Sequence, residues 1–314
     1  MKGSRRILLA GVSSLAFALA APAAMAADLP VKAPPPAPVP QNEWTWWVEG
    51  GAQGVLGGPY VPGLIPAFDP RPSNWGWDAA GSLDYRFNGY WHISGDFRYG
   101  QNHKTSVSNQ FACISSCTKV YGRNSASRKE DNWVADFMVG REIGLGGGTS
   151  QIKGGVRVAE IRGTTNGNML LVSGFGSFVS SAYTQTNKFL GVGPRLALEG
   201  TVPIGGAWFI DYMGGLAGLY GHQSTDQVAT NITSGGACTS GCPINASTSG
   251  NGFVFNPDAM LGIAYALSPT TKLAINYHAD AYFGALRVFT PAGAPAHTDR
   301  IYHGPSLRLT MQLP

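Results

Sequence analysis

Residues 75–87 read WGWDAAGSLDYRF, and the alternation within this stretch decides the fold class. One face of the extended chain carries Trp75, Trp77, Ala79, Gly81, Leu83, Tyr85 and Phe87, whereas the other carries Gly76, Asp78, Ala80, Ser82, Asp84 and Arg86. Successive side chains of a β-strand point to opposite faces, so this segment offers one face to an apolar medium and the other to water.

The stretch continues through Asn88-Gly89, a two-residue hairpin turn signal, into WHISGDFRY at residues 91–99, which alternates in the same way. A soluble β-sandwich could use one such hairpin. The pattern recurs to the end of the chain and follows an export signal, which favours a barrel that crosses a membrane.

The first residues have the features of a secretory signal peptide. Three basic residues precede an apolar run at 7–19, and the sequence Ala24-Met25-Ala26 predicts cleavage between Ala26 and Ala27. Arg5-Arg6 also resembles a twin-arginine signal, but that route carries folded cargo and a membrane barrel must be exported unfolded.

Composition narrows the possible functions. The signal peptide holds three of the 22 Lys and Arg and none of the 18 Asp and Glu, so the mature chain is nearly neutral and offers no case for nucleic-acid binding. Charged residues are only 13%, against about 25% in soluble domains. No second long apolar run is present, so a membrane-embedded chain must cross with strands. We find no motif for a cofactor or a metal.

We predict three segments: a signal peptide at 1–26, a proline-rich periplasmic linker at 27–43 and an outer-membrane β-barrel at 44–314. The barrel is an all-β, transmembrane, antiparallel up-and-down barrel. Its ten predicted strands are 44–54, 74–87, 90–100, 132–143, 150–161, 188–202, 207–220, 252–267, 272–286 and 300–313.

The predicted connections alternate between short and long. Short ones lie at 88–89, 144–149, 203–206 and 268–271, and long polar ones lie at about 55–73, 101–130, 163–187, 221–250 and 287–299. Short periplasmic turns and long extracellular loops are typical of outer-membrane barrels. An even strand number places both ends of the barrel in the periplasm. Pro194, Pro257 and Pro305 fall inside predicted strands, where we expect β-bulges.

The inward phase of these strands is rich in charge of both signs, which predicts ion pairs across the lumen rather than a strongly ion-selective ring. Small inward residues, such as Gly191, Gly215 and Gly262, are expected to leave some room. A ten-stranded barrel is narrow, so the charged side chains either fill the lumen or line a constriction. The predicted lumen-lining residues are Asp78, Asp84, Arg86, His92, Asp96, Arg98, Asp136, Arg157, Arg195, Glu199, Asp211, Asp258, His278, Asp280 and Arg308.

The four cysteines form two C-x-x-x-C pairs in predicted external loops. In an oxidising compartment we expect local disulfides, Cys113–Cys117 and Cys238–Cys242, with a bridge between the two loops as the alternative.

Signals for catalysis are poor, and we expect no enzyme. Some ten-stranded barrels are proteases with Asp and His at the outer rim. The rim candidates here are His103, His222, His297, Asp226 and Asp299.

Two short segments resemble a known family. GVGPRL at 191–196 and GPSLR at 304–308 are similar to strands of the Legionella-type major outer-membrane, pore-forming proteins. The mature start ADLPVKAPP at 27–35 resembles that of alphaproteobacterial outer-membrane proteins, some of which join an N-terminal alanine to peptidoglycan. The resemblance implies a porin-like barrel, and it implies Ala27 as an attachment point.

We therefore expect a Gram-negative outer-membrane protein that forms a narrow passive pore for small polar solutes. The alternative is a structural or surface-interaction barrel with a closed lumen. The expected partners are outer-membrane lipid and lipopolysaccharide, the barrel-assembly machinery and, through Ala27, peptidoglycan. The sequence does not define the oligomeric state.

Overall fold

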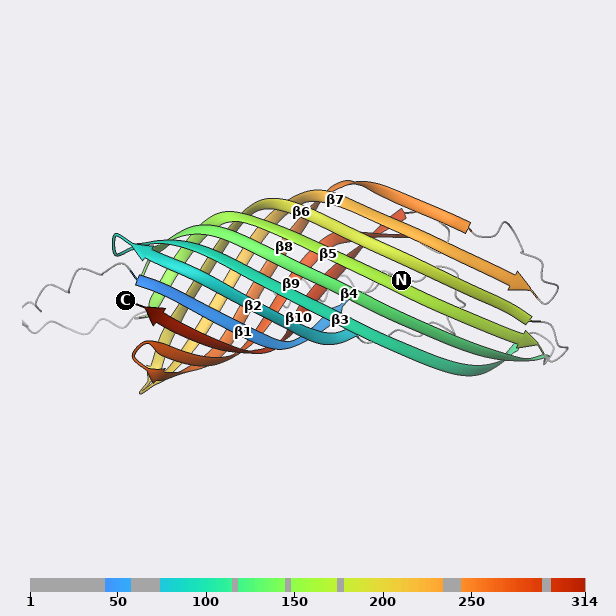
Figure 1. The fold of residues 1–314 in the computed structure, drawn as a ribbon, viewed down its shortest axis with the longest axis horizontal. Coiled ribbons are helices and arrows are strands. Elements are labelled where there is room, and N and C mark those ends of the chain that lie inside the picture. The colour runs from blue at the N-terminus through green and yellow to red at the C-terminus, as the bar shows by residue number, and fades with distance from the viewer. Residues whose placement is uncertain are drawn as a thin grey trace, which may run out of the picture. The chain divides into compact units, whose positions relative to one another are not determined.

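Ten antiparallel strands form a closed barrel in the computed structural model (Figure 1), which describes residues 43–57, 74–114, 118–144, 148–173, 178–233, 244–289 and 295–313. Each strand pairs with its sequence neighbours, and β1 closes on β10. The strands are β1 Glu43–Leu56, β2 Asn74–Phe87, β3 Trp91–Ile114, β4 Thr118–Glu142, β5 Thr149–Ser173, β6 Phe178–Gly205, β7 Trp208–Thr233, β8 Ile244–Ser268, β9 Thr271–Phe289 and β10 Pro295–Leu313. The predicted all-β, ten-stranded antiparallel barrel is confirmed.

Among the described residues, no helix has the length and apolar character needed to span a bilayer.

The short connections gather at one end of the barrel, which we call the turn end. The β2–β3 connection places Asn88 at φ 49° and Gly89 at φ 73°, the left-handed backbone that this dipeptide favours. Phe87 pairs with Trp91, so the loop has one residue more than the two-residue turn that the sequence predicts. Glu43 and Leu313 also lie at the turn end, where β1 and β10 pair. Short turns place this end toward the periplasm.

Four of the five expected long loops are the main error of the sequence prediction, and the fifth, 55–73, lies mostly outside the described residues. Within residues 101–130, β3 and β4 stay paired from His103 opposite Lys129 to Ile114 opposite Thr118. The described parts of the stretches 163–187, 221–250 and 287–299 likewise continue the strands on either side. Backbone hydrogen bonds do not depend on an apolar face. Where both faces of the wall are polar, the ladder persists although the hydrophobic alternation that revealed it has stopped. We call these extensions the outer half of the barrel.

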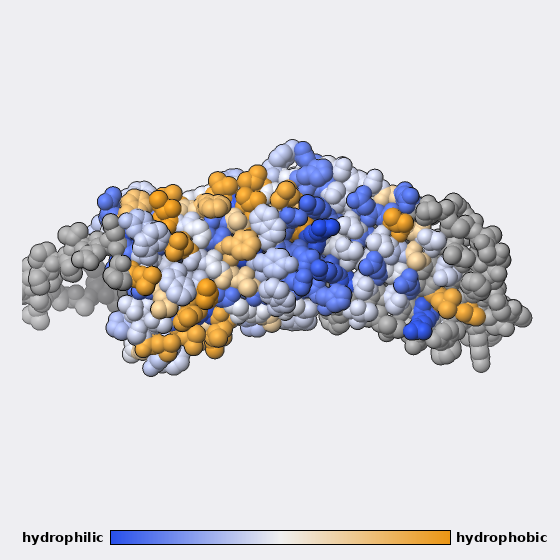
Figure 2. All heavy atoms as spheres, viewed as in Figure 1, coloured by the Kyte–Doolittle hydropathy of each residue, from blue (hydrophilic) through white to orange (hydrophobic). Residues whose placement is uncertain are grey.

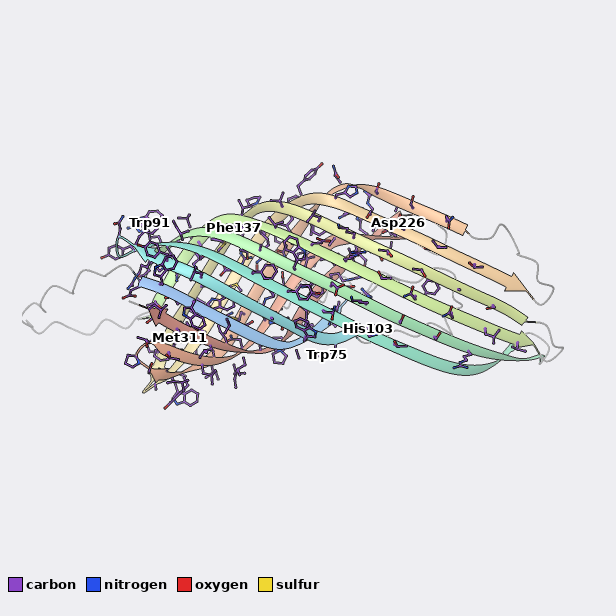
Figure 3. All side chains as sticks on the ribbon, viewed as in Figure 1. Trp75, Trp91, His103, Phe137, Asp226 and Met311 are labelled. Carbon is purple, nitrogen blue, oxygen red and sulfur yellow. The ribbon has the colours of Figure 1, made fainter. Side chains whose placement is uncertain are left out.

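The lipid-facing belt lies between the turn end and the outer half. Large apolar side chains such as Phe137, Leu196 and Ile275 are 65–68% exposed there. Figure 2 shows hydrophobic side chains over the half nearer the turn end, with hydrophilic ones beside them. In Figure 3, Trp91 lies near the turn end, Phe137 in the belt and Trp75 toward its other margin. Aromatic rows at both margins, with Trp44–Tyr85 and Trp77–Tyr99 ring contacts, are typical of a barrel in lipid.

The three prolines within strands produce no bulge, contrary to our expectation. At Pro194 the pairing of β6 with β7 skips from Val192–Tyr220 to Arg195–Ala217 and resumes in the same register. The β8–β9 and β1–β10 ladders skip Pro257 and Pro305 in the same way. A proline lacks only the donor toward one neighbour, so the ladder on its other side is kept. The recorded register shifts lie elsewhere, for example between Thr298 and Arg300.

Candidate functional site: a charged cavity beside an apolar layer

A cavity of about 260 Å³, lined by many charged side chains, occupies the lumen near the turn end. It lies among inward-facing side chains because the polar phase of every strand points away from lipid. The sequence-predicted residues that line it are Asp84, Arg86, His92, Asp96, Arg98, Asp136, Arg157, Arg195, Glu199, Asp211, Asp258, His278, Asp280 and Arg308. The remaining predicted residue, Asp78, is buried and forms an ion pair with Arg98.

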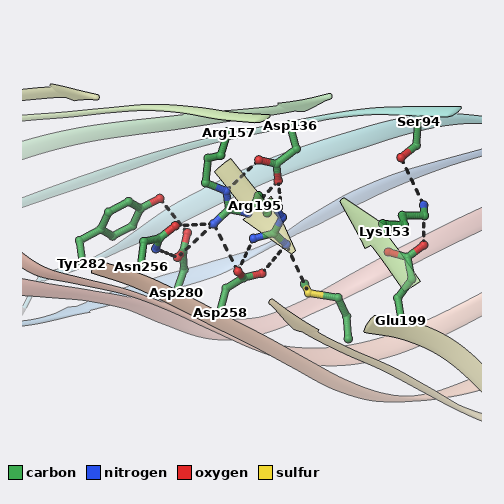
Figure 4. A network of polar contacts seen from close by, with 11 residues as sticks. Ser94, Asp136, Lys153, Arg157, Arg195, Glu199, Asn256, Asp258, Asp280 and Tyr282 are labelled. Carbon is green, nitrogen blue, oxygen red and sulfur yellow. Dashed lines mark hydrogen bonds and ion pairs between the residues drawn. The ribbon is translucent and has the colours of Figure 1, made fainter. Parts of the chain in front are cut away.

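Arg157 is the centre of the first charge cluster (Figure 4). Its Nε and Nη2 donate to the two carboxylate oxygens of Asp136 at 2.8 and 2.7 Å. Its Nη1 donates to Asn256 at 2.6 Å and lies 3.3 Å from Asp258. Arg195 forms a second two-point contact with Asp258. Two guanidinium groups thus connect β5 and β6 with β4 and, across the lumen, with β8.

Arg98 is the centre of the second cluster. Its guanidinium group contacts Asp78 and lies 2.7 Å from Glu49. Arg308 donates to the other oxygen of Glu49 at 2.7 Å. Donor atoms of Glu49, Asp78 and His278 lie within 4.8 Å of one another, a spacing that a metal ion could use. Arg98 and Arg308 already balance the two carboxylates, so this chemistry favours ion pairing over metal binding.

Lys153 anchors a third cluster nearer the turn end. Its Nζ lies 2.9 Å from Asp84 and 2.7 Å from Glu199. His92 lies 2.6 Å from Asp84 and 3.2 Å from Glu142, so Asp84 contacts both Lys153 and His92. Lys153 comes from β5 and Asp84 from β2, so this pair also bridges strands that are not neighbours in the sheet.

An apolar layer fills the lumen beyond the charged cavity. Phe189, Leu219 and Leu286, from β6, β7 and β9, are completely buried. The layer comprises Val134, Ala159, Ile161, Phe189, Ala217, Leu219, Val254, Tyr282, Ala285, Leu286 and Tyr302, with Val55 packed against it. In the remaining sector, Gln53 is fully buried and its backbone oxygen accepts a hydrogen bond from Asn102. Buried side chains from the described strands therefore pack between the cavity and the outer half.

The small inward residues do not leave the space that we expected. A Cβ added to Gly191 would meet the Phe189 ring at 2.5 Å, and one added to Gly215 would meet Asp258 at 2.6 Å. At Gly262 it would meet the Asn276 amide oxygen at 1.9 Å. Larger neighbouring side chains occupy these positions, as close packing requires.

Glu130 holds a buried polar cluster at the start of the outer half. Its carboxylate accepts a hydrogen bond from Tyr302 at 2.7 Å and contacts Arg300 at 3.2 Å and Arg128. The sequence prediction missed Glu130 because it placed residues 101–130 in a loop. It also omitted Glu49 from the lumen set, although the alternation that puts Trp46 and Val48 toward lipid turns Glu49 inward.

The rim candidates for catalysis come from β3, β7 and β10, and no two of these strands are neighbours in the barrel. His103 on β3 and Asp226 on β7 are exposed, and three strands separate them around the barrel (Figure 3). His222 contacts Asn251 at 3.1 Å, and Asp299 accepts a hydrogen bond from the backbone of Gly284 at 2.8 Å. His297 is exposed on β10. Among the described residues, none of these histidines forms a hydrogen bond or ion pair with one of these aspartates.

Several sequence-predicted features lie outside the described residues. They are the signal cleavage site at Ala26 and Ala27, and Cys117, Cys238 and Cys242. Cys113 belongs to β3, where the structure describes the backbone and not the side chain. The disulfide pairing stays a prediction.

Solved structures with a similar course of the chain are outer-membrane proteins of low sequence identity. The outer membrane protease OmpT from Escherichia coli matches with a TM-score of 0.47 and 8% identity, covering 87% of this chain and 96% of that one. The transport unit of the autotransporter AIDA-I from Escherichia coli gives 0.28 and 9%, covering 96% and 97%. The toluene transporter TodX from Pseudomonas putida gives 0.21 and 6%, covering 86% and 89%.

Sequence comparison identifies the family. A search of curated proteins found no match. The family described as Legionella pneumophila major outer membrane protein precursor matches residues 66–312, which include β2 to β9 and all but the last residue of β10. The chain therefore belongs to this family, and it is an outer-membrane β-barrel protein of a Gram-negative bacterium.

Proposed function

We propose that this protein works as a structural or surface-interaction barrel with a closed lumen, the second of the two functions expected from the sequence. The observation that carries the proposal is the apolar layer, in which Phe189, Leu219 and Leu286 have no exposed surface. A small polar solute would have to shed its water to cross this layer, and an unpaired polar group in apolar surroundings costs several kcal/mol.

The charge clusters support the same function. Arg157 joins β5 to Asp258 on β8, and Lys153 joins β5 to Asp84 on β2. Each of these contacts runs across the lumen instead of along one ladder. These ion pairs fix the distance between strands on opposite sides of the lumen, as expected for a rigid surface protein.

Recording in planar lipid bilayers tests this proposal. We expect the purified, folded protein to give no stepwise conductance above that of the same volume of detergent buffer. A heat-modifiable shift in gel migration serves as the control that the barrel is folded. Regular conductance steps from folded protein would overturn the closed lumen and establish the pore.

A narrow passive pore is the second candidate, and one observation favours it. The cavity is lined by both acids and bases, a polar surface that small hydrophilic solutes could enter from the turn end. For this function the apolar layer must rearrange to open a path. Liposomes that contain the protein would then swell in a solution of a small sugar, because the sugar would enter through the pore.

A further inference from the structure

A band of charged side chains lies on the outer surface, just beyond the lipid-facing belt. We define the interfacial patch as Lys129 and Asp131 of β4, Glu160 and Arg162 of β5, and Lys188 of β6. Their strands are adjacent, and the register places Asp131 opposite Arg162 and Arg162 opposite Lys188. Trp133, at the aromatic margin of the belt, lies opposite Glu160. Figure 2 shows hydrophilic side chains gathered beside the hydrophobic belt over these strands.

The two acids of the patch are already engaged. Asp131 accepts hydrogen bonds from Gln101 at 2.9 Å and from Tyr99 at 3.3 Å, and its other oxygen lies 3.6 Å from Lys129. Glu160 accepts a hydrogen bond from the Trp133 indole at 3.1 Å, and Lys188 contacts its second oxygen at 3.3 Å. Aromatic side chains of the belt margin therefore hold the carboxylates close to the wall of the barrel.

The three cations of the patch keep unused donors. The side chains of Lys129 and Lys188 are 54% and 46% exposed, and each uses one ammonium contact of the three it can make. Arg162 is exposed and forms no ion pair with another described residue. Arg162 and Lys188 lie directly opposite each other, and like charges in this position destabilise a sheet. An external anion between them would turn this repulsion into attraction.

We propose that the interfacial patch binds the phosphate groups of the phosphorylated glycolipid in the outer leaflet, the lipid A portion of lipopolysaccharide. The patch lies on the side of the belt away from the turn end, at the level of the outer-leaflet headgroups. The Arg162 guanidinium can present two parallel donors to one phosphate, and Lys188 and Lys129 supply point charges beside it. Acyl chains of the same lipid would lie against the belt below Trp133. This inference does not depend on whether the lumen is closed.

The experiment uses the full mature protein, folded in zwitterionic detergent and titrated with lipid A while bound lipid is counted by native mass spectrometry. Arg162→Ser is compared with Arg141→Ser, which makes the same change at an exposed, outward-facing arginine near the turn end. We expect Arg162→Ser to weaken lipid A binding about tenfold, the usual effect of losing one charge-assisted hydrogen bond. Adding Lys188→Ser should weaken it further, and Arg141→Ser should bind like the unchanged protein.

Two comparisons separate the phosphate from other sources of affinity. Dephosphorylated lipid A should bind the unchanged protein as weakly as it binds the Arg162→Ser variant. Inorganic phosphate at millimolar concentration should displace lipid A only in part, because phosphate lacks the acyl chains. Equal binding of lipid A with and without phosphates would overturn the proposal. An equal loss in Arg141→Ser would also overturn it, because the effect would then be general surface charge. Heat-modifiable migration shows that each variant is folded.

Discussion

Arg157 of β5 lies directly opposite Asp136 of β4 in the register and donates two hydrogen bonds to its carboxylate, at 2.8 and 2.7 Å. Both side chains are buried, with 5% and 7% exposure. The pair is therefore more than a cross-strand contact, because Arg157 also donates a hydrogen bond to Asn256 and forms an ion pair with Asp258 on the opposite wall. Without Arg157, Asp280 would lose its one cation among the described residues, and Asp136 and Asp258 would share Arg195 alone.

We expect Arg157→Met to lower the free energy of unfolding by about 3–5 kcal/mol, since a buried charge pair that loses one member leaves the other uncompensated. Urea titration of the folded protein, followed by gel migration, measures the change. Arg141→Met is the control. Arg141 is exposed on β4, with its guanidinium 6.0 Å from the Trp91 ring, and its replacement should change stability by no more than about 0.5 kcal/mol. Similar losses in both variants would contradict the role of the cluster.

The apolar layer can be opened by removing side-chain volume. Phe189→Ala with Leu286→Ala deletes two fully buried side chains, and we expect ion conductance where the unchanged barrel has none. Each deletion also costs about 2–5 kcal/mol of stability. The matched control is Phe137→Ala with Leu196→Ala, which removes the same atoms from lipid-facing positions that are 66% and 65% exposed. Conductance in the control, or its absence in a folded lumen variant, would show that this layer is not the seal.

Gly155 packs where no side chain fits. A Cβ there would lie 2.0 Å from the backbone oxygen of Phe137 on the neighbouring strand, so Gly155→Ala must displace a ladder. We expect a loss of about 1–3 kcal/mol, as in other overpacked sites. Gly95→Ala places its Cβ in open space and should be nearly neutral. Thermal shifts in gel migration compare the two, and a neutral Gly155→Ala would mean that the strands are farther apart than described.

The outer half should behave as β-sheet in solution. Residues 120–129 of β4 are paired on one side with β3 and on the other with β5, so their backbone amides are engaged in ladders. We expect hydrogen exchange in this stretch to be slow, comparable with that of residues 132–142 inside the belt. Exchange mass spectrometry measures both segments in one experiment. Complete exchange of 120–129 at the earliest time point would restore the loop that the sequence predicts.

The sequence predicts the belt well because lipid imposes a strict alternation on it. Residues 75–87 alternate since every second side chain contacts acyl chains, and the same pressure identifies all ten strands. Beyond the belt the strands no longer contact lipid, so their sequence is not constrained to alternate. His103 and Lys129 pair through their backbones, but nothing in their side chains distinguishes such a pair from a polar loop.

The sequence predicts which residues face the lumen, but it does not predict how their side chains pack against one another. Asp136 and Arg157 lie on the inward phase of strands that are neighbours in sequence, so their meeting is foreseeable. The contacts of Arg157 with Asp258, and of Phe189 with the position of Gly191, depend on strand tilt and rotamers that no local pattern encodes. For this reason, larger neighbouring side chains occupy the space beside the inward-facing glycines, although the sequence suggests that this space is open.

The ladder between β1 and β10 has a consequence for biogenesis. Trp44 pairs with Leu313, so the first strand, which also pairs with β2, gains its second partner only when the last strand has arrived. Until then the sheet has two open edges, each of which offers unpaired backbone groups to any other chain. The polypeptide therefore stays an open, incompletely paired sheet until its last strand is in place. The β1–β10 pairing costs the most chain entropy, and it is also the pairing that removes the exposed strand edges.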